Sequence, residues 1–305
     1  MNNAEIRKDY FLKKYVIIAP ARAKRPKELK EIATEKNSEI CVFCPENIDP
    51  KSVLDKIGAG EKWQVLSLEN VYPAVSLNNK KAYGTQEVII ETPKHDISLA
   101  NLPEEHVEKV LKMYAKRTAA ISKNKKIDYI LCFKNQGPRA GASLKHAHSQ
   151  VFATQILPPD IQEENKIVQE YKKEKNTCPY CDVIRKEVDS KREIYKDKHV
   201  FAFTPFASRY QYEAWIFTRR HLDNITKLTE EEFRSFAKVL KRILLKLELL
   251  NLPFNFFLHQ VVSEKDQHFY LKIEPRGSIW AGIELGSGLI INPVFPEDAA
   301  EFLKK

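Results

Sequence analysis

The residues from Asn135 to Gln150 combine the side chains that are needed to bind a phosphate group and to attack it. They read Asn-Gln-Gly-Pro-Arg-Ala-Gly-Ala-Ser-Leu-Lys-His-Ala-His-Ser-Gln. The glycines, Gly137 and Gly141, let backbone amides approach an anion closely. An imidazole beside such a loop predicts a nucleophile that attacks phosphorus. The alternative is a loop whose histidines are packed for structural reasons, and we place it second because Gly, Ser, His and Gln occur together.

The segments on both sides of this loop are predicted to be strands. Residues 127–133 are apolar and rich in β-forming side chains. If residues 146–150 are extended, side chains two apart share one face of the strand. His146, His148 and Gln150 would then point the same way, beside the loop.

The cysteine pattern indicates metal or redox chemistry rather than a disulfide framework. Four of the five cysteines form two Cys-x-x-Cys pairs, Cys41 with Cys44 and Cys178 with Cys181. Thioredoxin-like redox chemistry needs a βαβ context, and we expect Pro45 and Pro179 to lie in loops instead. The fifth cysteine, Cys132, is expected to be a buried small hydrophobic residue.

The second part of the chain repeats the order of the first: Cys-x-x-Cys, strands, His, a long helix, a strand and His. His95 and His146 are 51 positions apart, and His221 and His268 are 47 positions apart. The repeat predicts an α+β fold of two halves, residues 1–157 and 158–305, each an antiparallel sheet with a long helix. We expect helices at about 104–123, 160–175 and 229–251, and strands at 87–91, 151–156, 199–206, 212–218, 254–259 and 268–274. In the segment 15–26, a short strand is expected to run into a loop.

Each half offers two cysteines and two histidines, a ligand set that zinc accepts in closed structural sites. The prediction is two zinc ions per chain. The first site would use Cys41, Cys44, His95 and His146, and the second would use Cys178, Cys181, His221 and His268.

Nearly the whole chain resembles the galactose-1-phosphate uridylyltransferases and ADP-glucose phosphorylases, a branch of the histidine-triad superfamily. The resemblance rests on the 135–150 run, on Arg-x-x-Arg-Pro at 22–26, on Asn-Val-Tyr-Pro-Ala at 70–74 and on the run 282–298. It implies tandem histidine-triad-like halves. It also implies that His148 is the nucleophile that becomes nucleotidylated. Ala147 stands where most uridylyltransferases have Pro, which leaves the nucleophile in place.

The resemblance also implies the substrate contacts. Phosphate contacts carry over to Asn135, Gly141, Ser143 and Gln150, nucleoside contact to Asn70, contacts near the nucleotide phosphates to Arg22 and Arg25, and sugar or phosphate contacts to Glu284 and Asn292. Both metal sets match positions that bind zinc in the phosphorylase-like members. His259 is the rival for the last ligand of the second set, because another branch uses a histidine there.

Gln150 stands where the superfamily's hydrolases have a third histidine. An amide can hydrogen-bond phosphate but cannot shuttle protons at neutral pH. We therefore interpret the protein as a transferase whose substrates are UDP-glucose and a hexose 1-phosphate such as galactose 1-phosphate. The alternative is an ADP-glucose phosphorylase type of adenylyltransferase that uses inorganic phosphate.

A third hypothesis, a zinc-stabilised RNA-binding protein, is suggested by the net charge of +9 and by the Cys-x-x-Cys pairs. Lys and Glu are interleaved along the helical segments, which is typical of a solvated face. The interleaved aromatics and basic stripe of such proteins are lacking. We therefore expect no nucleic-acid partner.

The 305 residues contain no apolar run long enough to span a bilayer, and residues 1–10 are polar and charged without a signal-peptide core. We expect no membrane partner and a cytoplasmic location. A homodimer is one assembly that this interpretation allows.

Overall fold

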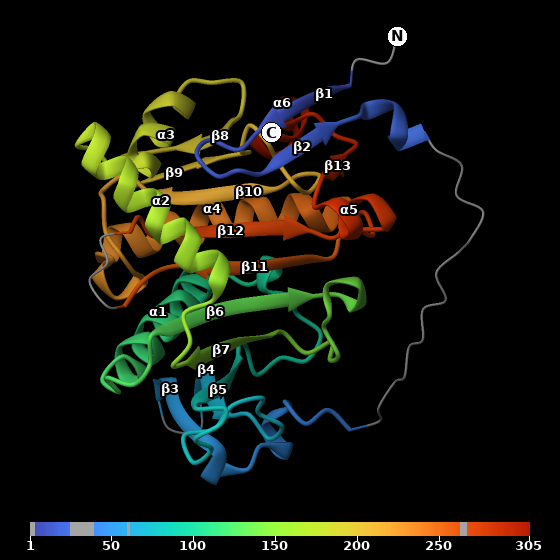
Figure 1. The fold of residues 1–305 in the computed structure, drawn as a ribbon. Coiled ribbons are helices and arrows are strands. Elements are labelled where there is room, and N and C mark those ends of the chain that lie inside the picture. Colours follow the sequence, from blue (N-terminus) through green and yellow to red (C-terminus); the bar gives the residue numbers. More distant parts are fainter. Residues whose placement is uncertain (1–3, 25–39, 60–61, 263–266) are drawn as a thin grey trace.

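The computed structural model describes residues 4–24, 40–59, 62–262 and 267–305. Within these ranges, the strands form a ten-stranded sheet and a separate three-stranded sheet (Figure 1). The strands are β1 (Glu5–Lys8), β2 (Tyr15–Ile18), β3 (Val53–Ala59), β4 (Lys62–Glu69), β5 (Gly84–Ile90), β6 (Tyr129–Gln136), β7 (His148–Thr154), β8 (Glu193–Lys196), β9 (Val200–Phe203), β10 (Ala214–Thr218), β11 (Phe254–His259), β12 (Tyr270–Pro275) and β13 (Ile290–Asn292). The α-helices are α1 (Glu104–Ile121), α2 (Pro159–Lys175), α3 (Pro179–Glu187), α4 (Glu230–Leu249), α5 (Gly282–Ser287) and α6 (Pro296–Lys304).

The large sheet has the order β3-β4-β5-β7-β6-β11-β12-β10-β9-β8, and its pairings are antiparallel. The first half therefore contributes five neighbouring strands, and the second half contributes five in mirrored order. The two halves meet where β6 pairs with β11, and Phe133 lies opposite Phe257 in that register. This arrangement confirms the predicted α+β fold with tandem halves. We propose the segment between β7 and α2 as the boundary between 1–157 and 158–305.

Helices α1 and α4 cover one face of the large sheet. Apolar side chains of α1 and α4, including Val110 and Leu240, share a buried core with Cys132, Val151 and Leu271 of the sheet. A Thr229 capping box starts α4, because the Thr229 hydroxyl accepts from Glu232 N–H and the Glu232 carboxylate accepts from Thr229 N–H. The predicted long helix of each half and the burial of Cys132 are thus confirmed.

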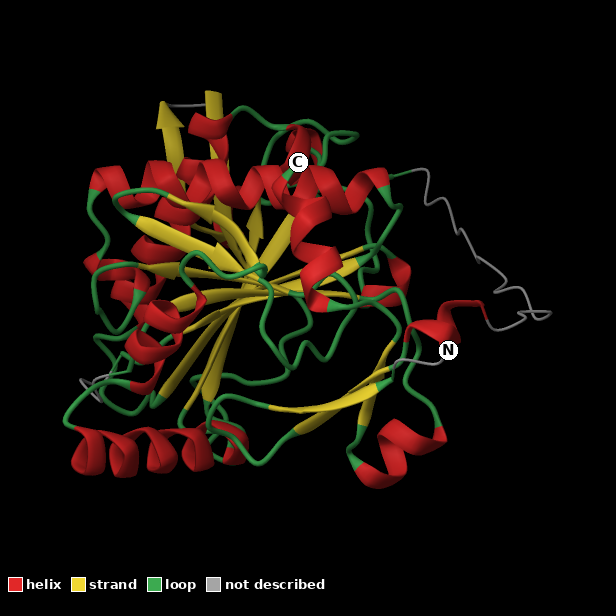
Figure 2. Cartoon of the chain, turned by 90° about the horizontal axis from the view of Figure 1, so that it is seen from above, coloured by secondary structure: helices red, strands yellow, loops and turns green. Residues whose placement is uncertain are grey.

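The opposite face is covered over the second half. Val168 of α2 and Tyr180 of α3 pack against Phe203, Phe217 and Tyr270 of the sheet. Figure 1 shows α2 crossing in front of β11 and β12, on the side away from α4, and Figure 2 shows helices on both sides of the sheet. His148 lies on the corresponding face of the first half.

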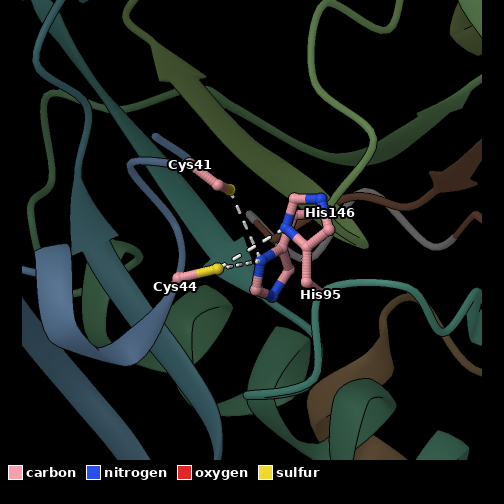
Figure 3. A group of neighbouring side chains, drawn as sticks. All are labelled: Cys41, Cys44, His95 and His146. Atoms are coloured by element: carbon pink, nitrogen blue, oxygen red, sulfur yellow. Dashed lines mark hydrogen bonds between the residues drawn. The ribbon is translucent and has the colours of Figure 1, made fainter. Parts of the chain in front are cut away.

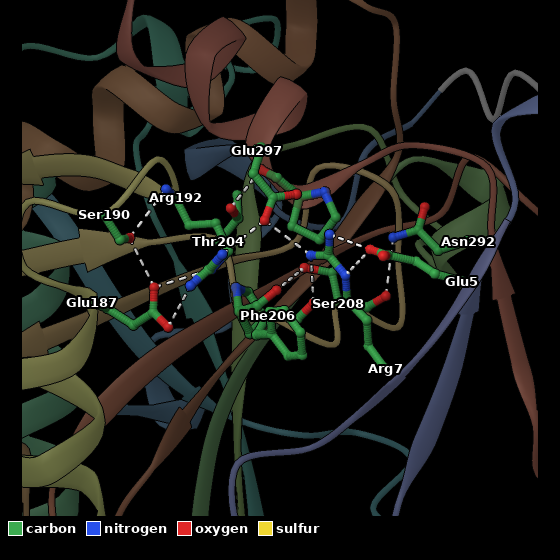
Figure 4. Close-up of polar contacts among 12 residues, drawn as sticks. Glu5, Arg7, Glu187, Ser190, Arg192, Thr204, Phe206, Ser208, Asn292 and Glu297 are labelled. Atoms are coloured by element: carbon green, nitrogen blue, oxygen red, sulfur yellow. Dashed lines mark hydrogen bonds and ion pairs between the residues drawn. The ribbon is translucent and has the colours of Figure 1, made fainter. Parts of the chain in front are cut away.

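The three-stranded sheet, β1-β2-β13, is held to the second half by a network of ion pairs (Figure 4). Arg192 binds Glu187 of α3 and Glu297 of α6 at 2.9 and 2.7 Å. Arg7 of β1 binds the same Glu297 carboxylate at 3.0 Å, and both guanidinium groups lie against the ring of Phe206. The network thereby ties the N-terminal strand, the C-terminal helix and α3 together.

Two expectations about local structure are wrong. Pro179 is the first residue of α3, and Pro45 is the first residue of a 3₁₀ turn, Pro45–Asn47. Proline suits the first turn of a helix because its missing N–H would have no helical partner there. In α1, Pro103 is the N-cap residue, directly before the first helical residue, Glu104. No helix in the described part of the chain is long and apolar enough to cross a membrane.

Candidate functional site

His148 is the first residue of β7 and is nearly buried, with 8% of its surface exposed. Its Nδ1 lies 2.8 Å from the backbone oxygen of His146. A carbonyl oxygen can only accept, so Nδ1 carries the proton and Nε2 keeps a free electron pair. Burial lowers the pKa of His148 below the ordinary value for histidine. The side chain therefore has the neutral form and the tautomer that a nucleophile needs.

A buried ion pair contacts the backbone of the strand that carries His148. Lys134 Nζ lies 2.8 Å from Glu91 Oε2 and donates to the backbone oxygen of His148 at 2.9 Å. Both side chains are almost completely buried. Tyr114 of α1 donates to Ser149 on the same face of β7. Alternation along β7 therefore sends Ser149 toward the helices and His148 to the opposite face.

The glycine loop follows β6, as predicted, and contains the 3₁₀ turn Pro138–Ala140. Gly137 and Gly141 have φ of +83° and +86°, a region that side chains disfavour. A Cβ at Gly141 would lie 3.7 Å from Asn135 Nδ2. The Asn135 amide therefore points toward the glycine whose backbone is predicted to approach phosphate. Ser143 is exposed in the same loop.

Gln150 lies two residues after His148 on the same face of β7. Its Oε1 accepts a hydrogen bond of 2.7 Å from Gln86 Nε2 on the neighbouring strand β5. Gln86 Oε1 in turn accepts from the Ala74 amide at 3.0 Å. Asn70 starts this same loop, and its Oδ1 accepts from Tyr72 N–H. The structure thereby links the predicted nucleoside loop to the predicted phosphate amide through Gln86.

The predicted first metal set comes together in the structure (Figure 3). Cys44 Sγ lies 3.5 Å from His95 Nδ1, and Cys41 Sγ lies 3.6 Å from His146 Nδ1. A tetrahedral zinc ion with ordinary bond lengths separates a sulfur from a nitrogen ligand by about 3.6 Å. The side chains therefore fit a tetrahedral ion.

The second predicted set also comes together, in the second half. Cys181 Sγ lies 3.4 Å from Nδ1 of both His221 and His268, and Cys178 completes the group. In each site the last histidine donates its other ring nitrogen to a threonine carbonyl, at 2.8 Å from His146 to Thr92 and at 2.9 Å from His268 to Thr218. This bond fixes the tautomer in which Nδ1 is free to bind a metal.

His259, the rival ligand, is not in the second group. Its Nε2 lies 2.9 Å from Glu164 of α2, and its ring stacks on Tyr270. Among the described residues, His268 and not His259 lies beside the cysteines, and its role as a metal ligand stays a prediction.

The remaining predicted contacts lie on other elements. Arg22 is exposed in the 3₁₀ turn after β2, and Arg25 lies outside the described residues. The Glu284 carboxylate accepts from Ala281 N–H at the start of α5. Asn292 is buried, and its amide donates to Ser208 and Tyr210 carbonyls at 2.9 and 3.2 Å. The side chain of Asn292 thus serves the fold in this conformation.

The second half has no histidine at the position that corresponds to His148. His268 corresponds to His146, so the residues two and four positions further correspond to His148 and Gln150. These residues are Tyr270 and Lys272. Tyr270 is buried against α2 and α3, and Lys272 pairs with Glu274 at 2.9 Å. The candidate site therefore lies on the face of the first half that carries His148 and Gln150.

Three residues of the site were not singled out from the sequence: Gln86, Lys134 and Asn255. Asn255 Nδ2 donates to Asn135 Oδ1 at 2.8 Å and to the Ala140 carbonyl at 2.7 Å. Each of these residues acts through a neighbour that is distant in sequence. His106 is half-buried, and its Nε2 lies 2.7 Å from the Glu91 carbonyl oxygen.

Comparison with known proteins agrees with this geometry. The profile of the galactose-1-phosphate uridyl transferase N-terminal domain matches residues 1–158, and a profile described only as a domain of unknown function (DUF4921) matches 92–304. The chain is 31% identical to an ADP-glucose phosphorylase from Arabidopsis thaliana, over 99% of this chain and 92% of that protein. It is 29% identical to a galactose-1-phosphate uridylyltransferase from Thermotoga maritima, over 99% and 98% of the two chains. The crystal structure of an Arabidopsis thaliana ADP-glucose phosphorylase with bound ADP-glucose superimposes with a TM-score of 0.86, 32% identity and 99% coverage of both chains. The chain thus belongs to the galactose-1-phosphate uridyl transferase family.

Proposed function

We propose that the protein transfers a nucleotidyl group from a nucleotide sugar to a phosphate-bearing acceptor, through a covalent intermediate on His148. The hydrogen bond from His148 Nδ1 to the His146 carbonyl carries this proposal, because it leaves Nε2 as the free nucleophile. Nε2 attacks the α-phosphorus, an N–P bond forms, and the P–O bond to the sugar phosphate breaks. The acceptor's phosphate oxygen then takes the nucleotidyl group from His148.

The glycine loop supports the charge that develops on the phosphoryl oxygens. Backbone amides near Gly141, the Ser143 hydroxyl and the Asn135 amide are the donors that the loop can offer. Gln150 can donate to the same oxygens but cannot pass a proton to water at neutral pH. The intermediate on His148 is therefore expected to react with a phosphate acceptor in preference to water.

The proposed substrates are UDP-glucose and galactose 1-phosphate, as the name of the Thermotoga maritima relative suggests. The proposed substrate-binding residues are those that the family resemblance implies: Arg22, Arg25, Asn70, Asn135, Gly141, Ser143, Gln150, Glu284 and Asn292. A second candidate is adenylyl transfer from ADP-glucose to inorganic phosphate. The Arabidopsis thaliana structure with bound ADP-glucose favours this candidate, because it superimposes over almost the full length of the chain.

Both Cys₂His₂ groups are proposed to hold zinc, two ions per chain. Zinc would fix the Cys41–Cys44 turn to the strand that carries the nucleophile, and would tie α3 to β12 in the second half. The proposed location is the cytoplasm, and the proposed assembly is a homodimer. Light scattering of the purified protein tests the assembly, and a single-chain mass would contradict it.

Four parallel reactions test the proposal. UDP-glucose and ADP-glucose are each incubated with the protein, and galactose 1-phosphate or inorganic phosphate is then added. The expected result is nucleotidyl transfer with ping-pong kinetics for one donor and acceptor pair. Sequential kinetics, or no transfer in any of the four reactions, would refute the proposal.

A further inference from the structure

Two amide side chains beside His148 can bind phosphate only if they face it with the correct end. Asn and Gln each have an NH₂ group that donates and an oxygen that accepts. Phosphate oxygens accept hydrogen bonds, so an amide that turned its oxygen toward them would repel the substrate. The directions of Gln150 and Asn135 are therefore a requirement of the proposed site.

The direction of Gln150 is fixed through Gln86. The backbone N–H of Ala74 can only donate, so the oxygen of Gln86 must face it, at 3.0 Å. The NH₂ group of Gln86 then faces Gln150, and its 2.7 Å bond requires the oxygen of Gln150 as acceptor. The NH₂ group of Gln150 remains as the end that can donate to a bound anion.

The direction of Asn135 is fixed in the same way through Asn255. The backbone oxygen of Ala140 can only accept, so the NH₂ group of Asn255 must face it, at 2.7 Å. The same NH₂ group lies 2.8 Å from Asn135, which must present its oxygen. Asn135 Nδ2 is then left facing Gly141, at 3.7 Å from the position of a Cβ there.

We infer that Gln86 and Asn255 are positioning residues of the proposed reaction. Each forms a hydrogen bond with a backbone group that can only donate or only accept. This bond fixes the orientation of its own amide, which in turn fixes the orientation of Gln150 or Asn135. Gln86 comes from β5 of the first half, whereas Asn255 comes from β11 of the second half and lies opposite Asn135 across the central seam. The second half therefore contributes to the phosphate site through Asn255. The inference rests on the proposed nucleotidyl transfer.

The test is a double-mutant cycle on the rate of single-turnover labelling of the protein by α-³²P-labelled UDP-glucose and ADP-glucose. In Gln86→Glu the carboxylate still accepts from Ala74 but cannot donate, so it draws the NH₂ group of Gln150 away from phosphate. Labelling is expected to slow by about 10- to 100-fold, the effect of a hydrogen bond to a charged group. In the Gln150→Met background, the same change is expected to slow labelling by less than about threefold.

Two further variants separate direction from charge. Gln86→Met removes the donor without adding an acceptor, and is expected to slow labelling less than Gln86→Glu does. Gln64→Glu places the same charge on the neighbouring strand β4 and is the matched control, with an expected effect below about twofold. The Asn255→Asp variant, alone and with Asn135→Leu, repeats the cycle for the second amide. Should Asn255→Asp fail to fold, Asn255→Ala takes its place in this cycle.

The outcomes distinguish failure of the proposed function from failure of the positioning roles of Gln86 and Asn255. If the wild type takes no label from either donor, the proposed function fails and the inference fails with it. If the wild type is labelled but Gln86→Glu is no slower than Gln86→Met, or slows labelling equally with and without Gln150, the inference is overturned and the function stands. Strong coupling in both cycles, with unchanged thermal melting, supports it.

Discussion

Replacing Lys134 by Met tests how the strand that carries His148 is held. Lys134 is 1% exposed and Glu91 is 0% exposed in their side chains, and the two charges are 2.8 Å apart. Met has a similar length and no charge, so Lys134→Met leaves the Glu91 carboxylate buried without its partner. Glu91 Oε1 has no hydrogen-bond partner among the described residues, so none of these would compensate at that atom.

Removing one partner of a buried ion pair lowers the free energy of unfolding by about 3–5 kcal/mol, because the remaining charge is uncompensated. Replacing both partners by apolar groups of similar volume is often neutral or stabilising. Lys134→Met is therefore expected to lower stability by about 3–5 kcal/mol, and Lys134→Met combined with Glu91→Leu is expected to recover most of that loss. Labelling of His148 should be slower than in the wild type in both variants, because the lysine that donates to the His148 carbonyl oxygen is gone in each.

Urea unfolding followed by circular dichroism measures both effects on stability. The control is Lys112→Met on α1, where the lysine is 32% exposed and pairs with the 60% exposed Glu230 and with Glu108 one turn earlier. Loss of these two partly exposed pairs should change stability by less than about 2 kcal/mol. The reasoning is refuted if Lys134→Met is no more destabilising than Lys112→Met, or if the double variant is as unstable as Lys134→Met.

Three further predictions concern metal, acceptor choice and loop geometry. Cys41→Ser should lower bound zinc from two ions per chain to one and destabilise the first half, since structural zinc contributes to folding; elemental analysis checks this, and two ions retained would contradict it. Gln150→His should raise hydrolysis of the nucleotide sugar relative to transfer, because an imidazole can pass a proton to water; an unchanged ratio in a product assay would show that Gln150 does not set acceptor choice. Gly137→Ala should lower stability by about 1–3 kcal/mol, because φ is +83° and the new Cβ would lie 3.1 Å from Pro253. Gly286→Ala lies inside α5, and apart from its chain neighbours and the backbone of its own helix no described residue comes within 4 Å of the new Cβ. This change should be neutral or stabilising, and equal effects of the two substitutions in urea unfolding would contradict this explanation.

The parts of the fold that the sequence predicted are those with a strong local signal. Helix α4 has a capping box and a buried apolar stripe, and its predicted range differs from the observed one by one or two residues. Both metal groups could be predicted because Cys-x-x-Cys and two histidines follow in the same order in each half, and because the family resemblance implies the same positions. Strands β3 and β4 were missed. In β3, Asp55 and Lys56 are adjacent, so its sequence lacks the apolar–polar alternation that predicts a strand.

The parts that could not be predicted depend on pairing between distant strands. Gln86 and Asn255 take their roles from backbone groups of Ala74 and Ala140, and no local pattern announces such a contact. Asn292 carried the family's pattern, yet in the structure its amide binds two backbone carbonyls. A motif therefore locates a residue in sequence without showing which end of its side chain is occupied.

The most direct measurement of the central claim is the site of nucleotidylation. The protein is incubated with nucleotide sugar labelled in its α-phosphate and then digested under basic conditions, and the labelled peptide is sequenced by mass spectrometry. We predict one nucleotidyl group on His148, lost in acid and stable in base. His148→Ala should take no label and retain its zinc, whereas His146→Ala should lose zinc as well as activity. Label on another residue, or undiminished labelling of His148→Ala, would contradict a covalent intermediate on His148.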